Sequence, residues 1–331
     1  MSPGFDDYLA AAVKCGGRVA PLLEVIRSTL PSSMLPLPGS GETKQRFRAL
    51  ARIAAADVTA ARVLEPHLDA VAILAEAEAR VPDRGTAWGV FAAEAPGAAL
   101  VAHEEDEGWV LRGRKEWCSL AGQLTDALVT AATPEGDRVM FAVSLRGPRV
   151  RVESAQWVAR GLAEVVSGPV DFDDSPARPV GEEGWYLSRP GFRWGAIGVA
   201  ACWWGGCLPV LDALVARARR RPDDAIAAAR TGQLYRRLRD ARLALEDAAS
   251  RIDADDVLDA AVLAHAVRGT VADAVVATLD AARDVLGPAA LAFDEALARR
   301  CADLELYASQ YHRGRDDVAL AGHLSEGALS W

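Results

Sequence analysis

Residues 117–119 read Trp-Cys-Ser, which puts an aromatic ring, a thiol and a hydroxyl on consecutive residues. The basic cluster Arg-Gly-Arg-Lys at 112–115 comes just before them, and an apolar-polar alternation begins at Trp109. Alternation with a period of two is typical of a half-buried strand. These side chains are therefore expected at the centre of a β insert, between this alternation and the second apolar run that follows them.

The thiols do not form a metal-binding pattern. The five cysteines are odd in number and scattered, at Cys15, Cys118, Cys202, Cys207 and Cys301. Cys202 and Cys207 are five residues apart in an apolar segment, which is typical of buried thiols rather than of zinc ligands. We expect no metal site and a reducing, cytoplasmic compartment. The N-terminal residues lack a basic stretch followed by an apolar core, so no signal peptide is predicted.

Helical patterns surround this β segment. Upstream, apolar residues recur at spacings of three and four from Phe47 to Leu64. Between residues 86 and 180, β-rich segments alternate with Gly, Pro and Asp turns. After Gly184 the predicted helices cover about 191–221, 225–252, 254–286 and 289–311, which suggests an up-down bundle. We predict an α+β multidomain protein with an N-terminal helical domain (1–85), a middle β domain (86–183) and a C-terminal four-helix bundle (184–331).

Composition excludes two classes of partner. The 331 residues are 51% hydrophobic and carry a formal net charge of −9, whereas a nucleic-acid surface needs clustered positive charge. The basic run at 217–222 is interpreted as a solvated helix end. The apolar run at 192–215 is long enough to span a membrane, but it contains four glycines and a proline. We interpret it as a buried helix and expect no membrane partner.

The order and spacing of these segments resemble the acyl-CoA dehydrogenase family over nearly the full chain. Residues 106–132, DEGWVLRGRKEWCSLAGQLTDALVTAA, are similar to the family's central segment, and 88–100, WGVFAAEAPGAAL, stand where the family has its flavin and substrate turn. Residues 299–316, RRCADLELYASQYHRGRD, resemble its last helix. The resemblance implies a barrel-like β domain, FAD held between it and the bundle, and dimers or tetramers.

The resemblance also implies particular cofactor-binding residues. Trp117 becomes the neighbour of the flavin ring, and Cys118 and Ser119 the polar step after it; a purely structural place in the core is the alternative for Trp117. Phe91 and Ala93 lie in the flavin turn, with Ala93 where the family has a threonine. Ala98-Ala99-Leu100 replace the family's Gly-Ser-Asp.

Two further cofactor-binding segments depart from the family pattern. The Arg-x-x-Phe-Gly step that binds the diphosphate reads ARARRRPDDAI, where Arg219, or its neighbours Arg217 and Arg220, can replace the charge. The Gln-x-x-Gly-Gly segment that meets the adenine end in the neighbouring subunit reads DVLGPAAL, so Gly287 is kept and Pro288 replaces the second glycine. An arginine at a diphosphate forms charge-assisted hydrogen bonds. Altered geometry there predicts weaker FAD binding.

The family's usual catalytic base is a glutamate, either after a tyrosine near the last helix or at the start of the first bundle helix. Here His312 follows Tyr311, and the segment 192–204 contains no carboxylate. An unperturbed histidine titrates near ~6.5, so His312 is the candidate base, with a capping or hydrogen-bonding histidine as the alternative. On a continuing helix, Asp316 would stand one turn away and orient its ring.

Three functions follow from the resemblance. The first is an FAD-dependent oxidoreductase that desaturates an acyl-CoA or a related activated acid. The second is a non-catalytic partner subunit that pairs with an active paralogue in a heteromer, instead of forming a homo-oligomer. The third is a flavin-dependent monooxygenase of the same fold, in which a histidine near the C-terminal helix assists catalysis.

Overall fold

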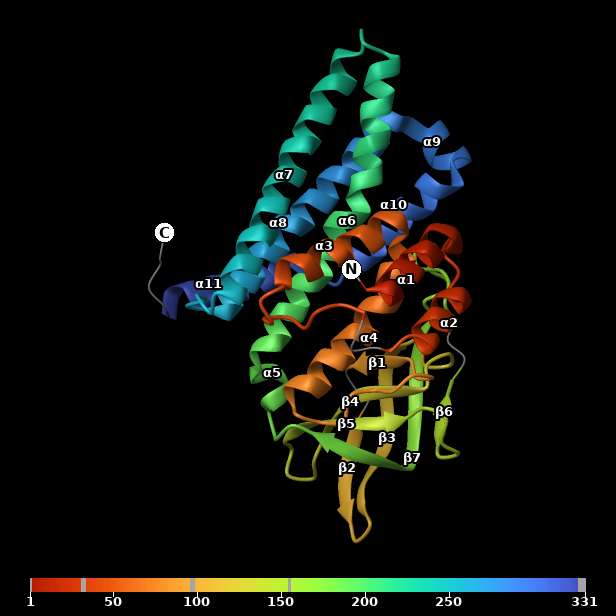
Figure 1. Cartoon of the computed structure of the whole chain (residues 1–331), viewed down its shortest axis with the longest axis vertical. Coiled ribbons are helices and arrows are strands. Elements are labelled where there is room, and N and C mark those ends of the chain that lie inside the picture. Colours follow the sequence, from red (N-terminus) through yellow and green to blue (C-terminus); the bar gives the residue numbers. More distant parts are fainter. Residues whose placement is uncertain (1, 31–33, 96–98, 154–155, 327–331) are drawn as a thin grey trace.

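The computed structural model describes residues 2–30, 34–95, 99–153 and 156–326. A β domain lies at one end of an elongated molecule, long helices extend to the other end, and the N-terminal helices lie between them (Figure 1). The predicted order of helices, β domain and helical bundle is therefore confirmed.

Within the described residues, the N-terminal region consists of four helices, of which the first and the fourth begin at a side-chain cap. Ser2 caps the first helix, and the Asp57 side chain accepts a hydrogen bond from Ala60 N at the start of the fourth. The extended backbone of Asp57 separates the third helix from the fourth, and Pro66 lies inside the fourth. The helices are α1 (Pro3–Cys15), α2 (Ala20–Ser28), α3 (Thr43–Ala56) and α4 (Val58–Glu76).

The described residues of the middle domain form seven strands: β1 (Trp88–Phe91), β2 (Leu100–Glu105), β3 (Gly108–Ser119), β4 (Asp126–Ala132), β5 (Arg138–Ser144), β6 (Val150–Val152) and β7 (Ser167–Val180). Strand β2 pairs with β3, β3 with β7, β7 with β5, β5 with β4, and β4 with β2, so that the five strands close a barrel. Strand β1 is added to β4 and β6 to β7. A closed barrel leaves few open edges and holds the end of β3 in a fixed position.

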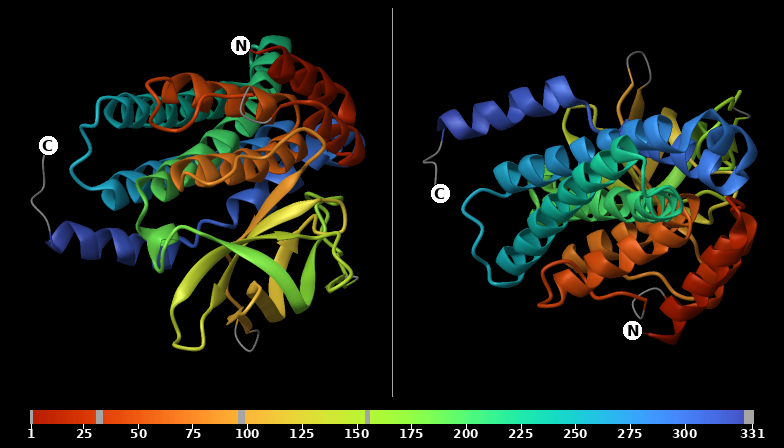
Figure 2. Two further views of the ribbon diagram at one scale, coloured as in Figure 1. Left: turned by 60° about the horizontal axis from the view of Figure 1, so that its bottom comes forward. Right: turned by 90° about the horizontal axis from the view of Figure 1, so that it is seen from above.

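The C-terminal region contains more helices than predicted: α5 (Trp185–Ser188), α6 (Pro190–Arg220), α7 (Ala225–Asp253), α8 (Ala260–Ala281), α9 (Gly287–Phe293), α10 (Glu295–Ala308) and α11 (Arg313–Glu326), with a π-helical turn at Ala282–Leu286. The predicted bounds 254–286 and 289–311 were wrong because Asp259 and Asp294 cap new helix starts at α8 and α10. Helix α11 lies beside α8 and projects away from the rest (Figure 2).

Helix α6 is the central helix of the molecule, in contact with α3, α4, α7 and α8. It packs closely on α3, because a Cβ atom on Gly205 would lie 2.2 Å from the carbonyl oxygen of Ala51. In the part of the chain that the structure describes, two helical stretches are long and apolar enough to cross a membrane, Pro190–Arg220 and Ala260–Phe293. The first is covered by other helices, which agrees with the interpretation as a buried helix.

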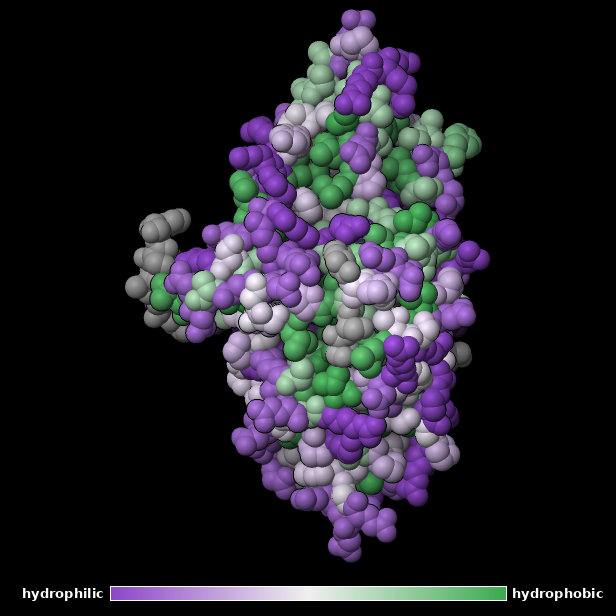
Figure 3. Space-filling view, in the orientation of Figure 1, coloured by the Kyte–Doolittle hydropathy of each residue, from purple (hydrophilic) through white to green (hydrophobic). Residues whose placement is uncertain are grey.

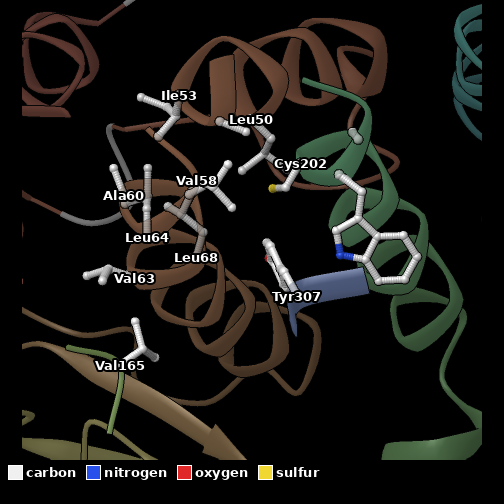
Figure 4. Close-up of a cluster of buried hydrophobic side chains, with 14 of the residues drawn as sticks. Leu50, Ile53, Val58, Ala60, Val63, Leu64, Leu68, Val165, Cys202 and Tyr307 are labelled. Atoms are coloured by element: carbon white, nitrogen blue, oxygen red, sulfur yellow. The ribbon is translucent and has the colours of Figure 1, made fainter. Parts of the chain in front are cut away.

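The hydrophobic core between α3, α4 and α6 includes a buried tyrosine from α10. Leu50, Leu64 and Leu68 come from α3 and α4, and Cys202 from α6 (Figure 4). Tyr307 of α10 lies between α4 and α6 and is fully buried (Figure 4). Helix α10 therefore brings a hydroxyl group into the place where α4 and α6 meet.

Candidate active site

The end of β3 is built to turn one aromatic ring outward. The register between β3 and β7 shifts between Lys115 and Cys118, which is a β-bulge, and Trp117 within it has φ +60°. A bulge redirects side chains, and a left-handed backbone is costly for a bulky residue. The Trp117 side chain is 60% exposed. The interpretation of Trp117 as a core residue was therefore wrong.

The hydroxyl of Ser119 joins the barrel to the helices. Its Oγ lies 2.7 Å from the Ser167 Oγ on β7 and accepts a hydrogen bond of 3.1 Å from Arg62 Nη2 on α4. We name this place the α4–β3 junction, defined by Trp117, Ser119, Ser167 and Arg62. It combines an exposed ring, two hydroxyls and a cation where the β domain meets α4.

Helix α4 presents one polar stripe on an otherwise buried surface. Arg62, Glu65, Asp69 and Glu76 follow one another at spacings of three, four and seven, so they share one face. The Glu65 carboxylate lies 4.0 Å from Arg62 Nη1 and accepts a hydrogen bond of 3.3 Å from the Tyr307 hydroxyl. The stripe therefore extends the junction from β3 to α10.

Burial changes the protonation of Glu65. Its removal from water raises the pKa to about 7, even though Arg62 lowers it, and Asp69 adds to the rise. A carboxyl group with a pKa near neutrality exists in both forms at physiological pH. Such groups concentrate at functional sites.

Two further side chains complete the surroundings of Tyr307. The Trp203 ring packs edge-on against it at 6.2 Å between centroids, and the Arg268 guanidinium lies 4.8 Å from the Trp203 centroid. Arg268 Nη1 donates to the Ala196 carbonyl oxygen, and burial lowers the pKa of this arginine. Among the described residues, the indole N–H of Trp203 is buried without a hydrogen-bond partner.

The turn after β1 is fixed by a buried lysine. Lys115 is 3% exposed, and its Nζ donates to Glu94 Oε1 and to the Thr130 hydroxyl, each at 2.9 Å. The ion pair places Ala93 at the surface beside this anchored turn. By contrast, Phe91 is 2% exposed and belongs to the core.

The thiol of Cys118 also points inward. It is 1% exposed and donates to the Lys115 carbonyl oxygen, and burial raises its pKa to about 12. The side chains of Phe91 and Cys118 are thus both buried in the core. Ala99 lies just before β2, and Leu100 is its first residue. Ala98 lies outside the described residues.

His312 lies in the turn between α10 and α11. The helix does not continue through it, so the predicted contact between its ring and Asp316 was wrong; instead its backbone N–H donates to Asp316 Oδ2 at 3.0 Å. The side chain is exposed. The neighbouring Tyr311 is buried and donates to Asp317 Oδ1. His312 is therefore a surface residue of this chain.

Arg219 and Gly287 lie in the bundle away from the β domain, at the end of α6 and the start of α9 (Figure 1). Within one chain they do not come together with Trp117. A groove of about 530 Å³ between α7 and α8 is lined by Arg230, Arg236 and Arg237 and also by Asp240 and Asp280, and Arg230 is paired with Asp284. The sequence analysis did not select these arginines, and Arg219 is not among the residues that line the groove.

Sequence reasoning missed the helical half of the site. Arg62, Glu65 and Tyr307 were not selected, although charged residues at helical spacing within a long apolar pattern are a detectable signal. Among the described residues, no group of three or more His, Cys, Asp or Glu side chains can hold a metal ion.

Comparisons with known proteins agree with this architecture. Residues 182–319 match the model of the acyl-CoA dehydrogenase C-terminal domain. The FMN-bound TdsC of Paenibacillus sp. A11-2, a dibenzothiophene monooxygenase, superposes with a TM-score of 0.81 at 15% identity, with 98% of each chain covered. No curated protein matches the sequence.

Two other solved structures are similar. Butyryl-CoA dehydrogenase of Megasphaera elsdenii gives a TM-score of 0.80 at 15% identity, with 98% of each chain covered. The nitrososynthase of Micromonospora carbonacea var. africana gives 0.76 at 21% identity, covering 99% of this chain and 94% of the other. The fold is that of the acyl-CoA dehydrogenase flavoproteins. The C-terminal region of this chain matches that family in sequence as well, which confirms the resemblance.

Proposed function

We propose that the protein is a flavin-dependent oxidoreductase that binds FAD at the α4–β3 junction and desaturates an acyl thioester. The observation that carries the flavin assignment is the ring of Trp117, which the bulge of β3 turns outward beside the hydroxyls of Ser119 and Ser167. A planar cofactor with a polar edge needs both an aromatic wall and hydrogen-bonding groups. Butyryl-CoA dehydrogenase and FMN-bound TdsC, which share the fold, support a flavin here.

The residues of the junction have separate tasks in this proposal. Trp117 flanks the ring, while Ser119 and Ser167 hydrogen-bond to its polar edge. Arg62, already held by Ser119, supplies a positive charge for electron-rich atoms. A bound flavin would be the oxidant of the substrate, and the protein would orient the flavin and the substrate.

The phosphate groups would be held elsewhere, by a second copy of the chain. The arginine-lined groove between α7 and α8, together with Arg219 and Gly287, lies away from the α4–β3 junction of its own chain. Guanidinium groups bind phosphates through charge-assisted hydrogen bonds. This separation supports a homo-oligomer that completes the cofactor site across subunits.

Flavin binding can be tested by absorbance between 350 and 500 nm. We expect the purified chain to retain or take up FAD, and Trp117→Ala to weaken its binding at least tenfold without a drop in melting temperature. Tyr235→Ala is the control, because Tyr235 is an aromatic residue of similar exposure on α7. Unchanged FAD binding by Trp117→Ala would contradict the assignment. FMN is titrated in parallel, since the fold accepts it in TdsC.

A flavin-dependent monooxygenase is the second candidate. It is favoured by His312, which stands where the family's carboxylate base is expected, and by the similarity to a dibenzothiophene monooxygenase. The test is anaerobic mixing of the flavin-loaded protein with acyl-CoA thioesters of four to sixteen carbons. Bleaching of the flavin supports desaturation. Absence of bleaching, with oxygen consumed only after the flavin is reduced externally, supports the monooxygenase.

The non-catalytic partner subunit gives a third outcome. A chain that is folded but takes up neither FAD nor FMN would support pairing with an active paralogue.

All five cysteines are free in the structure, which supports our proposal of a cytoplasmic protein.

A further inference from the structure

The proposed desaturation needs a base that the usual positions do not provide. His312 is exposed in the turn before α11, and α6 begins with PGFRWGAIG, which contains no carboxylate. A base must reach the substrate at the flavin, so the candidates are titratable side chains that border the α4–β3 junction. Glu65 is one turn along α4 from Arg62, which itself contacts Ser119.

The position of Glu65 suits proton transfer. Its side chain keeps 15% of its surface exposed, so the carboxylate is largely desolvated but still reachable. The Tyr307 hydroxyl donates to Oε2, and Oε1 accepts no hydrogen bond from the described residues. One oxygen is therefore oriented by α10, while the other is free to accept a proton.

Charged and titratable groups face Glu65 from every neighbouring helix. Arg62 and Asp69 share its helix, and Arg46 of α3 also favours its ionised form. Tyr186 of α5 and Arg268 of α8 also interact with it.

Two further groups, Tyr307 of α10 and Cys202 of α6, complete these surroundings, and burial keeps both neutral by raising their pKa values. The cations Arg62 and Arg46 prevent the pKa of Glu65 from rising further above about 7.

We propose that Glu65 is the proton acceptor of this site and removes the α-proton of the bound acyl thioester. The α C–H bond breaks and its proton passes to a Glu65 oxygen. The electron pair left behind would form the α,β double bond, and a bound oxidised flavin would accept the hydride that leaves the β-carbon. This assignment rests on the proposed function and identifies the residue that performs its proton transfer.

The first experiment measures anaerobic flavin reduction by octanoyl-CoA in stopped flow. We expect Glu65→Gln to retain flavin, because the amide oxygen still accepts from Tyr307, and to slow reduction by about 10²-fold or more. The control is Glu24→Gln, an exposed carboxylate on α2, which should reduce flavin within a few-fold of the wild-type rate. His312→Ala tests the alternative base and should also stay within a few-fold of wild type. Reduction at the wild-type rate by Glu65→Gln, or a loss confined to His312→Ala, would overturn the proposal.

The pH profile separates a chemical role from a structural one. Wild-type reduction should increase with pH around a midpoint near 7, because only the ionised carboxylate accepts a proton. Tyr307→Phe should move that midpoint upward, since the lost hydrogen bond favours the ionised form. An unmoved midpoint would overturn the assignment to Glu65.

The second experiment does not depend on hydride transfer. Deuterium incorporation at the α-carbon of octanoyl-CoA in D₂O is followed by mass spectrometry, with and without flavin. Wild-type protein should catalyse exchange and Glu65→Gln should lose it. Exchange without flavin binding would contradict the proposed function alone, whereas equal exchange by wild type and Glu65→Gln, or none by wild type, would overturn the role of Glu65.

Discussion

Three locally unfavourable features lie at the α4–β3 junction and around Tyr307, and further left-handed residues such as Leu162 and Asp174 lie elsewhere in the chain. Trp117 has a left-handed backbone, Glu65 is a desolvated carboxyl group, and the Trp203 indole N–H has no partner among the described residues. Each feature costs free energy of folding and is retained only where the surrounding structure enforces it. Their proximity argues for a site shaped by function rather than by stability.

The carboxyl of Glu65 should make stability depend on pH. Its pKa is raised from 4.5 to about 7 on folding, so the folded protein holds the extra proton. The resulting stability is complete below pH 4.5 and is lost as the pH rises through about 7. The loss is about 3 kcal/mol at roughly 1.4 kcal/mol per pKa unit.

Urea unfolding of wild type and Glu65→Gln at pH 4.5 and pH 8 measures this effect. Between pH 4.5 and pH 8, the free energy of unfolding should fall by about 3 kcal/mol less in Glu65→Gln than in wild type. Other raised carboxyl groups such as Asp303 are present in both proteins and cancel in the comparison. Equal losses would show that Glu65 has an ordinary pKa.

At the scale of elements, the contact between α3 and α6 depends on a glycine. A Cβ atom on Gly205 would overlap the Ala51 carbonyl oxygen, which belongs to helical backbone and cannot move aside. Gly205→Ala should therefore lower the free energy of unfolding by about 2 kcal/mol or more. Gly232→Ala on α7 is the matched control: it has open space around it, and alanine should stabilise that helix by up to about 1 kcal/mol. Thermal unfolding of both variants measures these changes in stability. A Gly205→Ala protein as stable as wild type would refute the close contact.

The sequence could predict elements that have a strong local signal. The alternation that begins at Trp109 and the apolar spacing from Phe47 to Leu64 correspond to β3 and to α3 with α4. The breaks between α8, α9 and α10 were missed, because capping by Asp294 competes with an apolar pattern that continues across it. Helical periodicity alone does not reveal such a break.

The site was predictable only in its β half. The Trp-Cys-Ser step is contiguous in sequence, so a resemblance could place Trp117 and Ser119. Glu65 and Tyr307 are 242 residues apart, and only the packing of α10 between α4 and α6 brings them together. His312 was selected because it follows Tyr311 where the family has its glutamate and because histidine titrates near neutrality. Its exposure depends on where α10 ends, which no local pattern defined.

At the scale of the whole molecule, apolar surface remains on the bundle. Hydrophobic side chains gather among the helices of the upper half (Figure 3). Phe293 on α9 is 89% exposed, Val276 on α8 50% and Ile226 on α7 74%. Large contiguous apolar surface on a folded chain marks an interaction site. The arginine groove between α7 and α8 lies on the same helices, so a partner there would also meet the proposed phosphate-binding residues.

We therefore expect at least a dimer, with an interface that buries well over ~1,000 Å². Light scattering at micromolar concentration should give at least twice the chain mass of 35.1 kDa. The double variant Val276→Asp/Phe293→Asp should shift the protein toward monomer, because two buried, unpaired carboxylates cost several kcal/mol of association. Val13→Asp, at a 68% exposed position on α1, is the control and should leave the mass unchanged. A wild-type mass near 35.1 kDa would refute the dimer, and with it the completion of the cofactor site by a second chain.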